Sequence, residues 1–182
     1  MKKFSSILYL SLGMIFFNFS NAEAKCNFIL KLGQKFNKSH ESRWGILNED
    51  PTSYAEHDIY ANEICKSDDF NDNFKVRHIF VQKKLMAIQF YVDNYFDNSA
   101  TESMKLMNYA KRIYGNFDTG PNPKLFNSYK LWKKNNKIVV YKRFLAEGIW
   151  DEEIFITNNE LKEELALYRS RLEQGFIDPK VN

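Results

Sequence analysis

Residues 76–93, VRHIFVQKKLMAIQFYVD, decide the fold of this chain. They hold two runs rich in β-branched and aromatic residues, Val76–Val81 and Leu85–Asp93, with the polar residues 82–84 between them. In the second run apolar residues recur at every second position, which is the period of a strand with one buried face. We therefore expect a hairpin with a short loop. The residues expected on its core face are Met86, Ile88, Phe90 and Val92.

Two helices follow from capping signals further along the chain. Ser99-Ala-Thr-Glu102 has the spacing of a capping box, in which the serine and the glutamate each satisfy a free backbone amide at a helix start. The helix is expected to end at Gly115, with Lys111 and Arg112 placed favourably for the helix dipole. Thr157-Asn-Asn-Glu160 is a second capping box and predicts a helix that ends at Gly175.

Four more segments have strand character, and one long segment has no regular period. A meander is predicted from Phe126–Lys133, Lys137–Leu145 and Ile149–Thr157, and an isolated strand from Cys26–Leu32. Residues 34–73 show no clean period, and 49–72 are rich in acids, so this part is expected to be an irregular, acidic loop region.

The expected order is therefore β, an irregular region, ββ, α, βββ, α. Hairpins dominate over crossover connections, which predicts an α+β fold with a mainly antiparallel sheet and two helices packed on one face. We expect one domain over residues 25–176 and a loose tail over 177–182. The chain has 182 residues, 44% hydrophobic and 16% aromatic, which suits one globular domain and excludes a disordered chain.

The first 24 residues have the pattern of a signal peptide. Lys2 and Lys3 precede an apolar core, and Ala22-Glu-Ala24 supplies small residues at the positions that a signal peptidase reads. The core is short for a membrane span, so a cleaved signal is favoured over a retained anchor, and no transmembrane segment is expected in the mature chain. The sequence thus predicts a periplasmic or secreted protein.

Cys26 and Cys65 are the two cysteines of the chain. In an oxidising compartment an even pair most simply forms one disulfide. Closing a loop of roughly 40 residues would stabilise the fold by about 4 kcal/mol in the chain-entropy model. The alternative is a reactive or metal-binding thiol pair, which their wide spacing disfavours.

A basic, aromatic segment is the best lead to a binding surface. No acid occurs between Asp118 and Glu147, and the formal net charge of the whole chain is +3. Such a surface suits an anionic glycan, a lipid head group or nucleic acid, although export makes nucleic acid the least expected of the three. The alternative is a solvated outer sheet face whose lysines discourage edge pairing. The candidate ligand-binding residues are Lys130, Trp132, Lys133, Lys142 and Arg143.

Catalytic and metal-binding patterns are weak. Glu56-His57-Asp58 places an imidazole between two carboxylates, but neighbours along a strand or helix point apart. Asp69, Asn71 and Asn73 have the spacing of the first ligands of a calcium loop, yet Phe74 stands where its turn needs glycine. No cofactor or metal is expected.

These observations lead to two functional expectations. The first is a non-catalytic binding or interaction domain of the bacterial cell envelope, with an envelope component or a protein as its partner. The alternative is a small periplasmic hydrolase that uses His57 and nearby carboxylates.

Overall fold

The computed structural model describes residues 26–28, 30–37, 40, 54–66, 70, 73–93, 99–116, 128–134 and 136–174. The predicted signal peptide and C-terminal tail lie outside the described residues, as do Asp69 and Asn71 of the calcium-like spacing. The limits predicted for the domain lie outside them as well.

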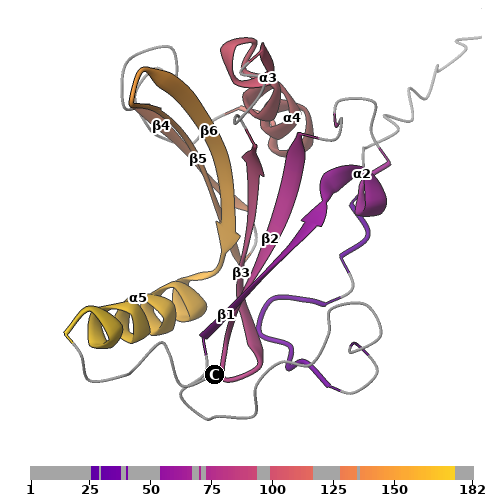
Figure 1. Cartoon of the computed structure of the whole chain (residues 1–182). Coiled ribbons are helices and arrows are strands. Elements are labelled where there is room, and N and C mark those ends of the chain that lie inside the picture. Colours follow the sequence, from indigo (N-terminus) through magenta and orange to yellow (C-terminus); the bar gives the residue numbers. More distant parts are fainter. Residues whose placement is uncertain are drawn as a thin grey trace, which may run out of the picture.

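The described part of the chain forms a six-stranded antiparallel sheet with helices around it, which confirms the α+β class (Figure 1). The strand order is β1-β2-β3-β6-β5-β4. The strands are β1 (Tyr54–Tyr60), β2 (Phe74–Val81), β3 (Lys84–Val92), β4 (Ser128–Lys134), β5 (Lys137–Ala146) and β6 (Ile149–Thr157). The helices are α2 (Ala61–Ile64), α3 (Ser99–Glu102), α4 (Lys105–Tyr114) and α5 (Asn159–Glu173). None of these helices is long and apolar enough to cross a membrane.

The β2–β3 hairpin forms as predicted, with one irregularity. The pairing changes register between Ile79 and Phe80, so that Met86 is an extra residue on β3. Such a bulge reverses the alternation of side chains. Met86 therefore packs with Ile79 on one face of the sheet, whereas Ile88 packs on the other, and the prediction that Met86 shares a face with Ile88 is wrong.

β1 lies inside the segment that was expected to be an acidic loop. Its burial alternates along Tyr54–Tyr60, with Ala55, His57 and Ile59 turned toward the protein. The acids stand on the other side, where Asp58 pairs directly with Arg77 of β2. The prediction of an irregular region is wrong here because opposite charges on the neighbouring strand compensate the acids.

The chain around Cys26 is not the regular strand that was predicted. Cys26 and Lys35 make isolated bridges, to Cys65 and to Lys84, and the residues described between them are irregular. The disulfide between Cys26 and Cys65 is present, as predicted. It ties this N-terminal segment to the end of α2.

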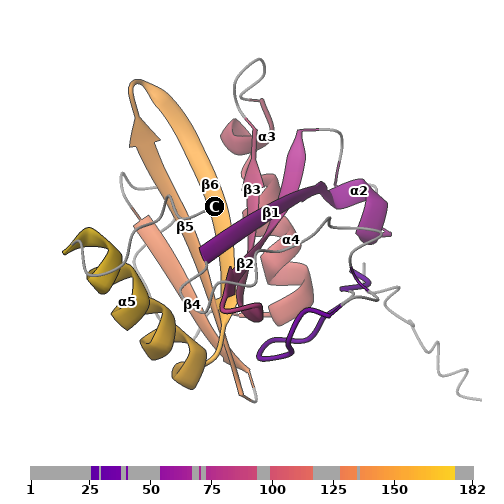
Figure 2. The ribbon, with the colours of Figure 1, turned by 60° about the horizontal axis from the view of Figure 1, so that its bottom comes forward.

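The helices lie on both faces of the sheet, not on one as predicted (Figures 1 and 2). We call the face that packs against α4 the inner face; its residues include Val76 and Phe90. The opposite, outer face carries α5, which packs on Ile79 and Ala87 near the β2–β3 turn. Each helix has an apolar stripe to bury, and the β2–β3 hairpin offers apolar side chains on both sides.

The helix expected from Ser99 to Gly115 is divided in two. Met104 adopts a left-handed conformation, with φ of 56°, between α3 and α4. No side chain of α4 itself caps its first turn. Instead, the carboxylate of Glu152, on β6, accepts hydrogen bonds from the backbone amides of Leu106 (3.1 Å) and Met107 (2.8 Å). The break therefore presents the free amides of a helix start to a buried acid on the sheet.

The start of α5 differs from its prediction by one residue. Asn158, not Thr157, is the capping residue, and its side-chain oxygen accepts from the amide of Leu161 at 2.8 Å. Thr157 is still in β6, where its hydroxyl donates to the carbonyl of Met86. The buried hydroxyl is already engaged in the sheet, and the next side chain takes over the cap.

Candidate functional site

One row of outer-face side chains runs across all six strands and changes its chemistry on the way. Cross-strand pairing places Leu131 of β4 beside Val140 of β5, and Val140 beside Phe155 of β6. The row continues through Gln89 of β3 to Arg77 of β2 and Asp58 of β1. The sheet is thus apolar on its β4–β6 half and ion-paired on its β1–β3 half.

A groove of about 560 Å³ lies between the apolar half of this face and α5. We call it the α5 groove. Its floor includes Leu131, Val140 and Phe155, all half-buried, with Ile138 beside them. The volume falls within the roughly 300–1,000 Å³ of small-molecule sites. The outer face is therefore hollowed where its side chains are apolar.

Cations surround this apolar floor. Lys133 and Lys142 rise from the sheet, and Lys162 and Arg169 come from α5, while Glu153 supplies a negative charge. The lining side chains described here sum to a net charge of +3. An apolar floor with an excess of cations is suited to a ligand that carries both an apolar part and negative charge.

Glu153 is held at the edge of the α5 groove by two neighbours. Its carboxylate forms an ion pair with Lys142 at 2.9 Å and accepts a hydrogen bond from Gln89 at 2.5 Å. These contacts orient Glu153 and offset part of the charge of Lys142. The other cations of the lining are Lys133 on β4 and Lys162 and Arg169 on α5.

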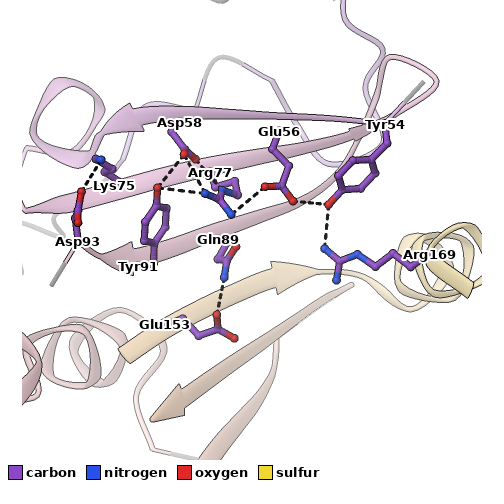
Figure 3. Close-up of polar contacts among 10 residues, drawn as sticks. All are labelled: Tyr54, Glu56, Asp58, Lys75, Arg77, Gln89, Tyr91, Asp93, Glu153 and Arg169. Atoms are coloured by element: carbon purple, nitrogen blue, oxygen red, sulfur yellow. Dashed lines mark hydrogen bonds and ion pairs between the residues drawn. The ribbon is translucent and has the colours of Figure 1, made fainter. Parts of the chain in front are cut away.

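The ion-paired half of the outer face is a connected network (Figure 3). Arg77 forms ion pairs with Glu56 and Asp58, each at 2.9 Å, and Tyr91 donates a hydrogen bond to Asp58 at 2.8 Å. Burial would raise the pKa of Asp58, but the bonds from Arg77 and Tyr91 outweigh it and lower the pKa. Burial and the bond to Asp58 raise the pKa of Tyr91 to about 12.

This network also reaches α5. The hydroxyl of Tyr54 donates a hydrogen bond to Glu56 at 2.5 Å and accepts one from Arg169 at 3.2 Å (Figure 3). The ring of Tyr54 stacks on Tyr168, with ring centroids 6.0 Å apart. The contacts hold the α5 side of the groove in position relative to β1.

Two of the five predicted ligand-binding residues meet in the α5 groove. Lys133 and Lys142 both line it, and the side chain of Lys142 is 53% exposed. Lys130 lies on the inner side of β4, whereas Lys133 lies on the outer side, and it is paired with Tyr141 of β5.

The other two predicted residues are not on the exposed surface that was expected. Trp132 is fully buried in the core, and its indole N–H donates to the carbonyl of Gly115 at 3.0 Å. Arg143 is 7% exposed, and its guanidinium lies 3.8 Å from the ring centre of Trp150. The large aromatic surface of Trp132 and the position of Arg143 on the inner face explain why both are buried.

His57 and its neighbouring acids lie on opposite faces of β1. The imidazole faces the inner side, directly opposite His78 on β2, whereas Glu56 and Asp58 bind Arg77 on the outer side. His78 is fully buried, and burial, followed by the nearby His57, lowers its pKa to about 4. The structure therefore does not bring His57 together with these two carboxylates. Among the described residues, no group of three or more His, Cys, Asp or Glu side chains is placed to hold a metal ion.

Sequence reasoning missed the contribution of α5 to the site. Lys162 and Arg169 are seven residues apart, which is two helical turns and places them on one face. That spacing was visible in the sequence. The strands that lie beneath this face are determined by the packing of α5 on the outer side of the sheet. Local sequence does not specify this packing.

Comparison with protein-family models, curated proteins and solved structures found no match for this chain.

Proposed function

We propose that this chain is an exported, non-catalytic binding protein of the cell envelope, and that it binds its partner in the α5 groove. The observation that carries the proposal is the groove itself: an apolar floor on three adjacent strands, with cations from both the sheet and α5 around it. The disulfide between Cys26 and Cys65 supports an oxidising location.

The chemistry of the groove lining supports binding over catalysis. Its carboxylate, Glu153, is engaged by Lys142 and Gln89. The neighbouring acids Glu56 and Asp58 are bound by Arg77. These carboxylate oxygens are already engaged by neighbouring side chains, which makes them less available to a substrate as acid, base or nucleophile.

The test fills the groove without changing its charge. Val140→Trp places an indole on the groove floor, and Tyr129→Trp places the same side chain at an exposed position outside the lining. Both variants are checked for folding by circular dichroism and then incubated with separated lipid, peptidoglycan and protein fractions of a bacterial envelope. We expect Val140→Trp to lose most of the retention shown by the unmodified chain, and Tyr129→Trp to keep it. Equal retention of a folded Val140→Trp variant would remove the groove as the binding site.

A further inference from the structure

We infer that the ligand of the α5 groove is a single-chain amphiphile with an anionic head group, an inference that rests on the proposed function. The apolar tail lies on the stripe formed by Leu131, Val140 and Phe155. The head group lies toward Lys162 and Arg169 of α5.

The floor fits one narrow tail. Its three main residues stand side by side on adjacent strands, about 4.8 Å apart, so the stripe is about 10 Å long. Beyond Phe155 the same row becomes Gln89, Arg77 and then Asp58. An apolar tail that extended over those side chains would remove the charges of Arg77 and Asp58 and the amide of Gln89 from water. Apolar contact with the tail therefore stops at β3, where the row becomes polar. This limits the length of tail that the protein can bury.

The cations at the edge of the groove, Lys133, Lys162 and Arg169, are called the rim, and they suit an anionic head group. Lys162 and Arg169 are both exposed and lie about 10.5 Å apart along α5, on the side that lines the groove. Arg169 is already oriented by the hydroxyl of Tyr54 at 3.2 Å, a neutral partner that leaves the positive charge in place. Lys133 adds a third cation from the sheet. Carboxylate and phosphate oxygens are the natural partners of such groups.

The geometry favours this ligand over an anionic polymer. A glycan or nucleic acid would place polar groups on Leu131, Val140 and Phe155, which offer no hydrogen bonds in return. A peptide strand would require a free sheet edge, but these three residues lie on the face of paired strands. An amphiphile satisfies the floor and the rim together.

The test uses 11-(dansylamino)undecanoate as a fluorescent probe for the full chain without its first 24 residues. Competitors are saturated carboxylates of 6 to 16 carbons, myristoyl-lysophosphatidylglycerol, uncharged monomyristoylglycerol and inorganic phosphate. We expect one saturable site. Affinity should rise about two- to fourfold per methylene and level off once the tail exceeds the stripe. The uncharged lipid and phosphate alone should each compete at least tenfold more weakly than the best anionic amphiphile. The carboxylates and the lysophospholipid distinguish a free fatty acid from a phospholipid as the source of the head group.

Charge reversal on the rim provides the matched control. The double variant Lys162→Glu, Arg169→Glu should bind the probe at least tenfold more weakly. Lys111→Glu with Arg171→Glu reverses two exposed cations outside the groove lining and should change affinity less than twofold. If both double variants bind alike, or if the uncharged lipid competes as well as the anionic ones, the anionic head group is wrong. If no amphiphile displaces the probe while Val140→Trp still abolishes envelope retention, this inference fails and the proposed function stands. If Val140→Trp also has no effect on retention, both fail.

Discussion

Glu152 is the most consequential buried charge among the described residues. It is 2% exposed, and its carboxylate accepts from two amides of α4 and from the hydroxyl of Tyr141 at 2.9 Å. Burial raises its pKa to about 7, against the opposing effect of these bonds. The side chain therefore connects β6, β5 and the first turn of α4 through one group.

Removal of this group should destabilise the protein strongly. Glu152→Ala leaves two amides and a phenol without their acceptor in the core, and we expect a loss of about 3 kcal/mol in the free energy of unfolding, measured with urea. Glu163→Ala, on the exposed side of α5, is the control and should change it by less than about 0.5 kcal/mol. A Glu152→Ala variant as stable as the control would mean that α4 does not depend on this cap.

Little in the sequence indicates that Glu152 caps α4. Glu152 stands in a strand next to Asp151 and Glu153, and nothing local separates the acid that faces inward from those that face outward. Its partners are 45 and 46 residues away along the chain. The same limit applies to Trp132, where the basic residues on each side suggested an exposed surface, yet the indole is buried in the core.

At the scale of elements, the β2–β3 turn carries backbone strain that can be relieved. Gln82 and Lys83 both have positive φ, of 51° and 62°, in a two-residue turn of the kind that favours Asn-Gly. Lys83→Gly should stabilise the protein by about 1 kcal/mol, because glycine adopts this conformation without steric cost. The measurement is the urea midpoint, with Lys83→Ala as the control that removes the side chain but keeps the Cβ atom. Equal midpoints for the two variants would show that the turn is not strained.

Secondary structure was predictable where one local signal sufficed. The β2–β3 hairpin, the β4–β6 meander and α5 follow from periodicity and caps, and all are present. β1 was missed because its acids resemble a solvated loop until Arg77 is placed opposite them. That both faces of the sheet are covered had a signal as well, in the uninterrupted apolar runs 79–81 and 85–88, which are all buried. Such uninterrupted runs are typical of strands covered on both sides.

At the scale of the whole molecule, the disulfide connects the N-terminal segment to the core. The described residues between Cys26 and Asn37 lie along the inner face and the β2–β3 turn. Single backbone hydrogen bonds join them to these elements, such as that from the amide of Gly33 to the carbonyl of Leu85. The link between Cys26 and Cys65 adds a covalent anchor to these bonds and to the burial of Leu30 and Phe36.

Loss of the link should therefore be costly. Replacing Cys26 and Cys65 together by alanine opens a loop with a sequence separation of 39 residues, and we expect the free energy of unfolding to fall by 2–4 kcal/mol. Dithiothreitol should lower the stability of the unmodified chain by a similar amount and leave the double variant unchanged. No response of the unmodified chain to reductant would contradict a stabilising role.

Two buried groups should oppose each other in the response of the whole molecule to pH. Glu152 has a folded-state pKa of about 7 against 4.5 for the free group, so between these values the folded state holds more protons. Its contribution to stability is complete below pH 4.5 and is lost as the pH rises through 7. His78 has a folded-state pKa of about 4 against 6.5, so over that range the unfolded state holds more protons. Its contribution is complete above pH 6.5 and is lost as the pH falls through 4.

Each contribution amounts to about 3 kcal/mol over its full range, and between pH 4.5 and 6.5 the two have opposite slopes. The two slopes therefore cancel in the unmodified chain, and each should be measurable in a variant that lacks the other group. Glu152→Gln removes the acid, so relative to the unmodified chain its free energy of unfolding should rise with pH across this window. His78→Phe removes the imidazole, and its relative stability should fall with pH over the same range. Urea titrations at pH 4.5, 5.5 and 6.5 measure both slopes. The free energy of unfolding of the double variant should have the same pH dependence as that of the unmodified chain. Parallel pH curves for all four proteins would mean that neither group changes its proton binding on folding, and slopes of the same sign would mean that one of the two shifts has been assigned the wrong direction.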